Sequence, residues 1–279
     1  MQIKKFSPLK DVIDLEILDG DYLRCECGKR PLDIVMSHIL KIMICEKIVP
    51  DKASLRRNSP VPLSSFYYSS QNPQFIGEKT LILLHPDFTS EVASRLIGEV
   101  PEVACVLKGS PQDTVGQFDR NCAINHFELL EGDDTQINVM RTLLGEKIVL
   151  VKKQSIHHIE VAMTTEQKLV NLHNYLKNND IKKGIAVDGM CGLGALGIYL
   201  LKFGFEKVIF NDINPEMTDA LKKNLEINGI EEGYEIINGA FEDLDTEHAD
   251  LCIIDAFPKM DVAEINEKAQ KIADNVVII

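Results

Sequence analysis

The sequence predicts an α/β protein whose C-terminal part is a doubly wound parallel sheet, and two observations support this prediction. From residue 183 onward, short apolar runs alternate with segments of helical periodicity. The first of those runs ends in a glycine-rich stretch that opens the following helix. Such alternation is typical of parallel strands whose connecting helices cover both faces of a sheet.

Five strands and three intervening helices are expected in this part. Each strand is a short apolar run, and each helix repeats its apolar residues at helical spacing. The expected strands are 184–188, 207–212, 234–238, 250–255 and 275–279, and the expected helices are 193–204, 215–228 and 261–273. The last strand would leave an apolar sheet edge, so we expect the N-terminal half or a partner subunit to cover it. A homodimer is therefore the expected assembly.

The N-terminal half predicts a smaller α/β unit. A helix over 31–49 starts at a proline, and strand 79–86, helix 87–100 and strand 102–109 form a β-α-β pattern. The remaining assignments are loops at 50–78 and 110–135, a strand at 147–153 and a helix at 164–179. We therefore expect two domains: an N-terminal α/β substrate or oligomerisation domain over 1–160 and a nucleotide-binding, Rossmann-like domain over 161–279.

Composition and charge narrow the functional classes. The 279 residues carry a formal net charge of −13 and a pI near 5.0, which argues against the basic surface of most nucleic-acid binders. There is no apolar run of 18 residues and no N-terminal apolar signal region, so we expect a cytoplasmic protein without membrane partners. The seven cysteines have neither disulfide nor zinc-site spacing, and no metal is expected.

The stretch "GIAVDGMCGLGALG" over 184–197 is the main functional signal. A strand that ends in a glycine loop and opens a helix directs backbone N–H groups toward a bound ligand. Gly192, Gly194 and Gly197 match the dinucleotide pattern G-x-G-x-x-G, which alone is a weak signal. Asp212 ends the next strand, where a carboxylate can accept both hydroxyls of an adenosine ribose. Both a nicotinamide dinucleotide and S-adenosylmethionine would be consistent with these residues.

Three further features favour S-adenosylmethionine. Asp188 lies between the strand and the first glycine, where it would repel a pyrophosphate but attract the sulfonium and amino groups of that cofactor. The phrase "NDINPE" surrounds Asp212. The fourth strand ends in "DAFP" over 255–258, at the carboxyl edge of the sheet where a ligand should lie.

Residues 183–279 resemble the cofactor half of class I S-adenosylmethionine-dependent methyltransferases. The phrases "NDINPE" and "KKNLEING" are most similar to those of archaeal-type tRNA guanine methyltransferases. The resemblance implies cofactor-binding roles for residues at the first three strand ends, namely Asp188, Gly189, Gly192, Gly194, Asp212, Ile213, Ala240, Phe241 and Glu242. The first four would surround the methionine part, Asp212 would bind the ribose, and the remaining four would frame the adenine.

Asp255 and Phe257 are the candidate catalytic residues, because the resemblance places them facing the transferred methyl group. Asp255 would orient or deprotonate the acceptor, and Phe257 would shape its pocket. Base-modifying enzymes often have "N-P-P-Y" or "D-P-P-Y" here, and "D-A-F-P" departs from that phrase. We therefore expect a small metabolite or cofactor precursor, such as a hydroxylated or heterocyclic ring, as the acceptor. A tRNA guanine base is the first alternative, and an NAD-dependent dehydrogenase is the second.

Overall fold

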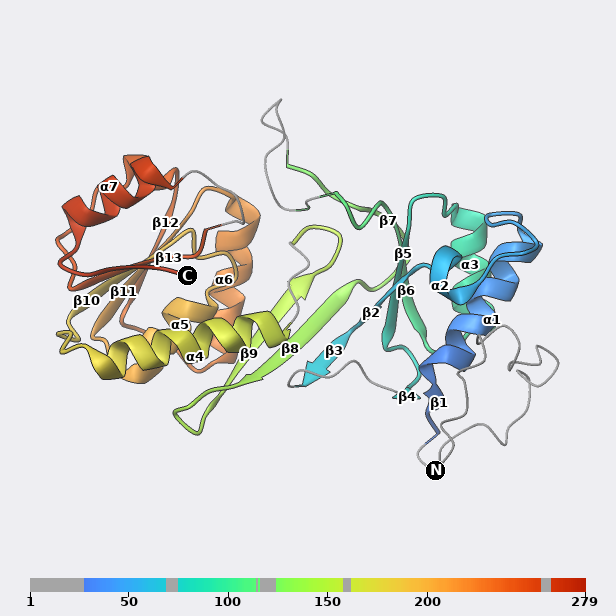
Figure 1. Cartoon of the computed structure of the whole chain (residues 1–279), viewed down its shortest axis with the longest axis horizontal. Coiled ribbons are helices and arrows are strands. Elements are labelled where there is room, and N and C mark those ends of the chain that lie inside the picture. Colours follow the sequence, from blue (N-terminus) through green and yellow to red (C-terminus); the bar gives the residue numbers. More distant parts are fainter. Residues whose placement is uncertain (1–27, 69–74, 114, 116–123, 158–161, 257–261) are drawn as a thin grey trace, which may run out of the picture. The chain divides into compact units, whose positions relative to one another are not determined.

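The computed structural model describes residues 28–68, 75–113, 115, 124–157, 162–256 and 262–279 (Figure 1). The chain divides into two units. The first unit comprises Met1–Ser65, Asn72–Val115 and Asn125–Thr135, and the second comprises Phe66–Gln71, Gly116–Ile124 and Gln136–Ile279.

The second unit contains a five-stranded parallel sheet. Its strands are β10 (Ile185–Gly189), β11 (Lys207–Asp212), β12 (Tyr234–Asn238), β13 (Leu251–Ile254) and β14 (Val276–Ile278). Their spatial order is β12-β11-β10-β13-β14, and all neighbouring pairs are parallel. The order reverses between β10 and β13, and ligands of doubly wound sheets bind at such a switch point, beyond the carboxyl ends of the strands. The predicted doubly wound parallel sheet is confirmed.

Helices cover both faces of this sheet, as the alternation of buried side chains along its strands requires. One face, which includes Ala186, Val208 and Leu251, packs against α4, α5 and α6. The other face, which includes Val187 and Ile209, packs against α7 and a short 3₁₀ helix. The helices are α4 (Ala162–Asn178), α5 (Ala195–Phe203), α6 (Pro215–Ile227), α7 (Ala263–Ile272) and the 3₁₀ helix η4 (Phe241–Asp243).

Local sequence sets the ends of the two helices beside the switch point. Helix α5 follows Gly194 and ends at Gly204, and both glycines have left-handed backbone conformations that other residues rarely adopt. Helix α6 begins with a proline after Asn214, whose side chain accepts a hydrogen bond from the Glu216 N–H. Both helices therefore start at the carboxyl edge of the sheet.

The second unit also contains a three-stranded sheet in the order β3-β8-β9. Its strands are β3 (Phe66–Tyr68), β8 (Thr135–Arg141) and β9 (Lys147–Lys153). Met140, Ile148 and Leu150 of this sheet belong to the same core as the α4 side chains Leu169 and Leu172. This small sheet is consequently part of the unit that contains the parallel sheet.

The first unit has a four-stranded mixed sheet in the order β2-β5-β6-β7, with a separate two-stranded pairing of β1 and β4. Its elements are β1 (Arg30–Pro31), α1 (Leu32–Cys45), α2 (Leu55–Asn58), β2 (Val61–Ser64), β4 (Phe75–Ile76), β5 (Leu81–His85), α3 (Ser90–Glu99), β6 (Val103–Lys108) and β7 (Glu128–Gly132). Its core combines apolar side chains of α1, α3, β5 and β6. The expected β-α-β pattern corresponds to β5, α3 and β6. The two strands β5 and β6 pair in parallel.

A buried ion pair joins two segments of the first unit that are distant in sequence. The Arg30 guanidinium donates to both carboxylate oxygens of Glu102, at 2.7 and 2.5 Å, and the residues are 6% and 1% exposed. A buried pair of this bidentate form fixes its segments because removal of one partner leaves the other charge unpaired.

The division between the units differs from the expected boundary near residue 160. Strands β8 and β9 belong to the second unit because their apolar face packs into the core of the parallel-sheet unit. Strands β2 and β3 lie within a segment predicted as loop, and β7 lies within another. No helix in the described ranges is both long and apolar enough to cross a membrane.

Candidate functional site

The first part of the site is the glycine loop, residues 190–194, which joins β10 to α5. Three of its residues have positive φ angles: Met190 at 60°, Gly192 at 51° and Gly194 at 85°. The loop therefore bends sharply at the carboxyl edge of the sheet. Its end opens helix α5, whose first N–H groups have no partners within the helix and can face a ligand.

Close packing requires glycine at three positions around this loop. A Cβ atom on Gly189 would lie 2.6 Å from Phe241, and one on Gly194 would overlap Leu221 of α6. A Cβ atom on Gly197 would overlap Phe210. Glycine at these positions brings α5 and α6 close to the strand ends, and so fixes the position of the loop.

Asp188, at the end of β10, is 1% exposed. Its Oδ2 atom accepts a hydrogen bond of 2.7 Å from the Gly197 N–H, whereas its buried Oδ1 atom has no partner among the described residues. Burial raises the pKa of this carboxyl to about 8, with smaller contributions from the charges of Asp255 and Asp212. A cation or a hydrogen-bond donor beside Oδ1 would satisfy the orphaned atom.

The raised pKa of Asp188 predicts a pH-dependent stability. The folded-state pKa of about 8 lies above the unfolded value near 3.8, so the folded protein retains the proton that the unfolded chain loses. The contribution of Asp188 is present in full below pH 4 and declines as the pH rises from about 4 to about 8. We expect the free energy of unfolding of the wild-type chain, relative to Asp188→Asn, to decrease over this range. Urea unfolding of both proteins at pH 5 and pH 8 measures the difference, and an unchanged difference would contradict the prediction.

Asp212, at the end of β11, is the second acidic residue of the site. Its Oδ2 atom accepts a hydrogen bond of 2.8 Å from the Gly192 N–H, and its Oδ1 atom accepts one of 2.9 Å from the Asn214 N–H. Burial raises its pKa. The carboxylate thus connects the glycine loop to the start of α6, and its remaining lone pairs can accept the hydrogens of two hydroxyl groups.

The predicted adenine contacts differ in exposure. Ile213, the residue after Asp212, is 53% exposed. Its apolar side chain is therefore accessible to a planar ring. Ala240 is half-buried and Glu242 is exposed. Phe241, by contrast, is 4% exposed and belongs to the core beneath Gly189. The Phe241 ring therefore packs against the end of β10. Its neighbours in the chain, Ala240 and Glu242, reach the surface.

Asp255 follows β13, the strand next to β10. Its Oδ2 atom lies 2.8 Å from the Lys168 Nζ atom of α4, and the two side chains are 24% and 22% exposed. The charge of Asp255 also contributes to the raised pKa of Asp188, which places the two carboxyls within electrostatic reach of each other. Phe257, the other predicted catalytic residue, lies outside the described residues.

Two buried cysteines lie near the site, Cys191 in the glycine loop and Cys252 in β13. Burial raises the pKa of Cys252 to about 12 and also raises that of Cys191, so both remain thiols. Within the described ranges, no cluster of three histidine, cysteine or acidic side chains is arranged to hold a metal ion. The polar groups that the described residues present at this edge include carboxyl groups, the Lys168 ammonium group and backbone N–H groups.

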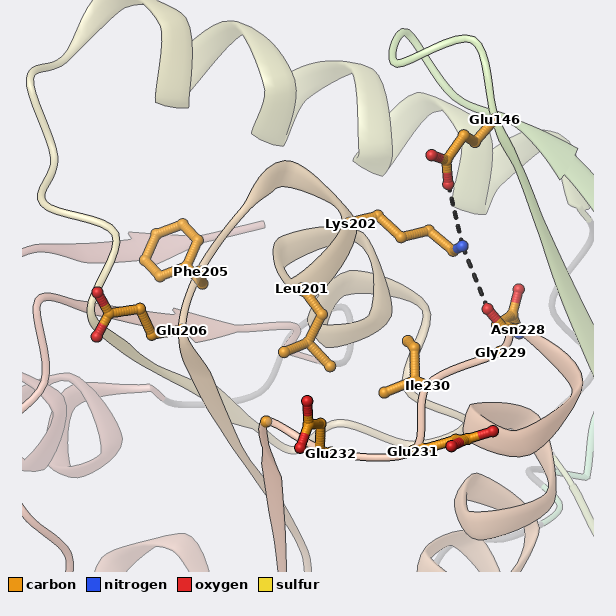
Figure 2. Close-up of a pocket in the computed structure, with 11 residues that line it drawn as sticks. Glu146, Leu201, Lys202, Phe205, Glu206, Asn228, Gly229, Ile230, Glu231 and Glu232 are labelled. Atoms are coloured by element: carbon orange, nitrogen blue, oxygen red, sulfur yellow. Dashed lines mark hydrogen bonds and ion pairs between the residues drawn. The ribbon is translucent and has the colours of Figure 1, made fainter.

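A separate hollow of about 830 Å³ lies at the amino ends of the strands of the parallel sheet, opposite the carboxyl ends that carry the site (Figure 2). Phe205 and Glu206 precede β11, and Gly233 precedes β12, so the hollow is at the amino ends of these strands. The Lys202 Nζ atom at its rim lies 3.0 Å from Glu146 Oε2 and also donates to the Asn228 carbonyl. The hollow is distinct from the site at the carboxyl ends.

Sequence reasoning missed two polar residues of the site. Lys168 lies on a helix that precedes the parallel sheet in the chain, so no local pattern connects it with Asp255. Asn211 is 1% exposed and its amide nitrogen donates to the carbonyls of Ile237 and Gly239. An asparagine inside a buried strand was the available signal, because a buried amide requires partners from the neighbouring strand.

Comparison with known proteins gives partial matches to methyltransferases. No protein-family model matches the chain. The ribosomal protein L11 methyltransferase of Acinetobacter baumannii is 41% identical over 56 residues, which are 20% of this chain and 19% of that protein. The same-named protein of Aeromonas hydrophila is 37% identical over 79 residues, 28% and 27% of the two chains. The chain thus spans about a fifth to a quarter of the length of these curated relatives.

Among solved structures, a Pyrococcus horikoshii protein described as a candidate transferase has a TM-score of 0.50 at 20% identity. The match covers 85% of this chain and 76% of that protein. The TYW2 protein of the same organism, solved in complex with MeSAdo, has a TM-score of 0.49 at 21% identity with the same coverage. At 20% identity, the likeness to the candidate transferase concerns the fold alone. The resemblance of this chain to S-adenosylmethionine-dependent methyltransferases, with their doubly wound parallel sheet, is thereby confirmed.

Proposed function

We propose that this chain is an S-adenosylmethionine-dependent methyltransferase. The observation that supports this most directly is the orphaned, buried Oδ1 atom of Asp188, directly before a glycine loop that is hydrogen-bonded to Asp212. The first carboxyl suits a cationic ligand, and the second suits a ribose. The exposed Ile213 adjoins Asp212 as an apolar surface for adenine. These residues together fit S-adenosylmethionine, which supplies an electrophilic methyl group when bound.

In this proposal, the residues at the strand ends align the reactants. Asp188 would hold the cationic part of the cofactor, and Asp212 would hold its ribose. The bound cofactor would supply an electrophilic methyl group to a nucleophilic atom of the acceptor. Asp255 accepts the proton that the acceptor loses, or orients the acceptor for the attack. Alignment of this kind lowers the barrier because the reacting atoms are held close together.

A small metabolite or cofactor precursor, such as a hydroxylated or heterocyclic ring, is our proposed acceptor. Three carboxyl groups gather at the carboxyl edge, from Asp188, Asp212 and Asp255, and the net charge of the whole chain is −13. Phosphate backbones bind preferentially to surfaces rich in lysine and arginine. A tRNA guanine base is the second candidate, because "NDINPE" and "KKNLEING" resemble the phrases of archaeal-type tRNA guanine methyltransferases.

Calorimetry with S-adenosylhomocysteine and with NADH tests the cofactor. Binding of S-adenosylhomocysteine without binding of NADH is expected, and the reverse result would establish the dehydrogenase alternative. Filter binding with tRNA over a series of salt concentrations tests the acceptor. Weak binding is expected, whereas tight binding that falls steeply with salt would favour the tRNA alternative.

Lys168→Met is expected to lower methyl transfer while leaving cofactor binding intact. The substitution removes the ammonium group that lies 2.8 Å from Asp255, so that carboxylate loses this charge-assisted hydrogen bond. We expect kcat/KM for the acceptor to fall by about tenfold, as for the loss of one charge-assisted hydrogen bond. Transfer of a labelled methyl group to a methyl-accepting extract fraction measures the effect.

Lys271→Met is the matched control for this experiment. Lys271 also forms an ion pair, with Glu267, but both side chains are about two-thirds exposed on α7. Its replacement should leave kcat/KM unchanged. Equal rates for Lys168→Met and Lys271→Met would exclude the proposed role of the Lys168–Asp255 pair.

A further inference from the structure

Asn224 connects two parts of the second unit that are far apart in sequence. The side chain is 0% exposed on the inner side of α6. Its Oδ1 atom accepts a hydrogen bond of 2.8 Å from the Val151 N–H of β9, and its Nδ2 group donates one of 3.1 Å to the Leu193 carbonyl. Leu193 belongs to the glycine loop. One buried amide group therefore binds the edge of the three-stranded sheet and the loop at the same time.

Asn228, one helical turn later, also bonds to β9, but among the described residues it does not bond to the glycine loop. Its Oδ1 atom accepts a hydrogen bond of 2.9 Å from the Val149 N–H, and its Nδ2 group donates to the carbonyls of Val149 and Asn224. A helical turn rises about 5.4 Å and two strand residues about 6.6 Å, so asparagines four residues apart can match alternate residues of β9. Asn228 has no hydrogen bond to the glycine loop within the described residues.

Two other hydrogen bonds join the backbone of the glycine loop to β11. The Cys191 N–H donates to the Asn211 carbonyl, and the Gly192 N–H donates to Asp212. Both attachments come from the end of β11. The bond from Asn224 to Leu193 is the attachment that comes from α6, on the other side of the loop. The loop is therefore held between β11 and α6 through its own backbone.

We propose that Asn224 is a positioning residue for the cofactor: it holds the glycine loop in its binding conformation and links that conformation to β9. The inference rests on the proposed function, since the loop is the part of the chain that would contact S-adenosylmethionine. Asn224 does not itself touch the ligand. It acts through the Leu193 carbonyl, as supporting hydrogen bonds around binding sites commonly do.

The variant Asn224→Asp tests this role. It keeps an oxygen to accept from the Val151 N–H but replaces the donor to Leu193 by a second oxygen, which repels the carbonyl. Asn228→Asp is the matched control, with the same change of charge on the same helix and no contact with the loop. We expect calorimetry with S-adenosylhomocysteine to show Asn224→Asp weakened by about tenfold or more and Asn228→Asp within about twofold of wild type.

Circular dichroism and thermal unfolding establish that each variant is folded. If Asn224→Asp is unfolded, Asn224→Ala is compared with Asn228→Ala in the same assay, with the same expected ratio. Equal affinities for the two asparagine positions would overturn the inference while the wild-type affinity upholds the proposed function. Unfolding of both Asn224 variants beside folded Asn228 variants would also overturn it, because Asn224 would then be a residue of the core. A wild-type chain that does not bind S-adenosylhomocysteine would overturn both proposals.

Discussion

Asp212→Ala is expected to weaken binding of S-adenosylhomocysteine by about a hundredfold or more. The carboxylate accepts hydrogen bonds from the Gly192 and Asn214 N–H groups, and in our proposal it also accepts both ribose hydroxyls. A hydrogen bond to a charged group contributes about 1.5–3 kcal/mol, and each 1.4 kcal/mol changes a dissociation constant about tenfold. Loss of the two proposed bonds to the ribose hydroxyls accounts for the expected effect. Calorimetry measures it.

Two comparison variants separate the carboxylate from a general loss of structure. Asp212→Asn retains one accepting oxygen, so we expect a loss of about tenfold. Asp219→Ala removes an exposed carboxylate of α6 that pairs with Lys222 and should leave the affinity unchanged. An Asp212→Ala affinity within about threefold of wild type would be incompatible with ribose binding at this residue.

Gly194→Ala is expected to destabilise the fold by about 3 kcal/mol. Its φ angle of 85° costs a side chain roughly 1 kcal/mol, and the added Cβ atom would also overlap Leu221. Leu221 is fully buried, so its methyl group can shift only if the surrounding core repacks, and overpacking of this kind costs about 1–3 kcal/mol. Urea unfolding followed by circular dichroism measures the change.

Gly145→Ala provides the control, because its φ angle is 82° and a Cβ atom there would meet nothing within 4 Å. It should lose only the conformational part, roughly 1 kcal/mol. The difference between the two variants isolates the packing of the glycine loop on α6. If both variants lose the same free energy of unfolding, close packing does not account for Gly194.

The parallel sheet was predictable because its strands are short, largely apolar runs separated by clear helix signals. The expected ranges 207–212 and 234–238 coincide with β11 and β12, and helix 215–228 is one residue longer than α6. Apolar periodicity is a strong signal when both faces of a strand are buried. These conditions hold for β10, β11 and β13, which are mostly buried, whereas β12 and β14 at the two edges of the sheet are only partly buried.

The strands that were missed lack these signals. Strand β2 contains Pro62, and β3 has only three residues. Strand β8 buries Gln136 and Asn138 between its apolar residues, so its buried face reads as polar. Such strands depend on partners elsewhere in the chain, and neither propensity nor periodicity identifies those partners. The division between the units differs from the expected boundary for the same reason, since no local pattern pairs β8 with β9.

The candidate site was predictable where a strand end determines the position of a residue. Asp188 and Asp212 lie at the carboxyl edge because β10 and β11 end there. The inward packing of Phe241 was not predictable, because it depends on the space beneath Gly189. The roles of Lys168 and Asn224 depend on α4 and β9, which precede the parallel sheet in the chain. Long-range contacts of this kind require the folded structure.

The contacts between α6 and β9 also bear on solubility. Strand β9 is at the end of its sheet, and an open strand edge offers backbone groups that can recruit a strand of another molecule. The side chains of Asn224 and Asn228 occupy the N–H groups of Val151 and Val149 on this edge. Two amide side chains thus protect the edge against intermolecular pairing. We expect that loss of these two contacts would expose the edge of β9 to pairing with a strand of another molecule.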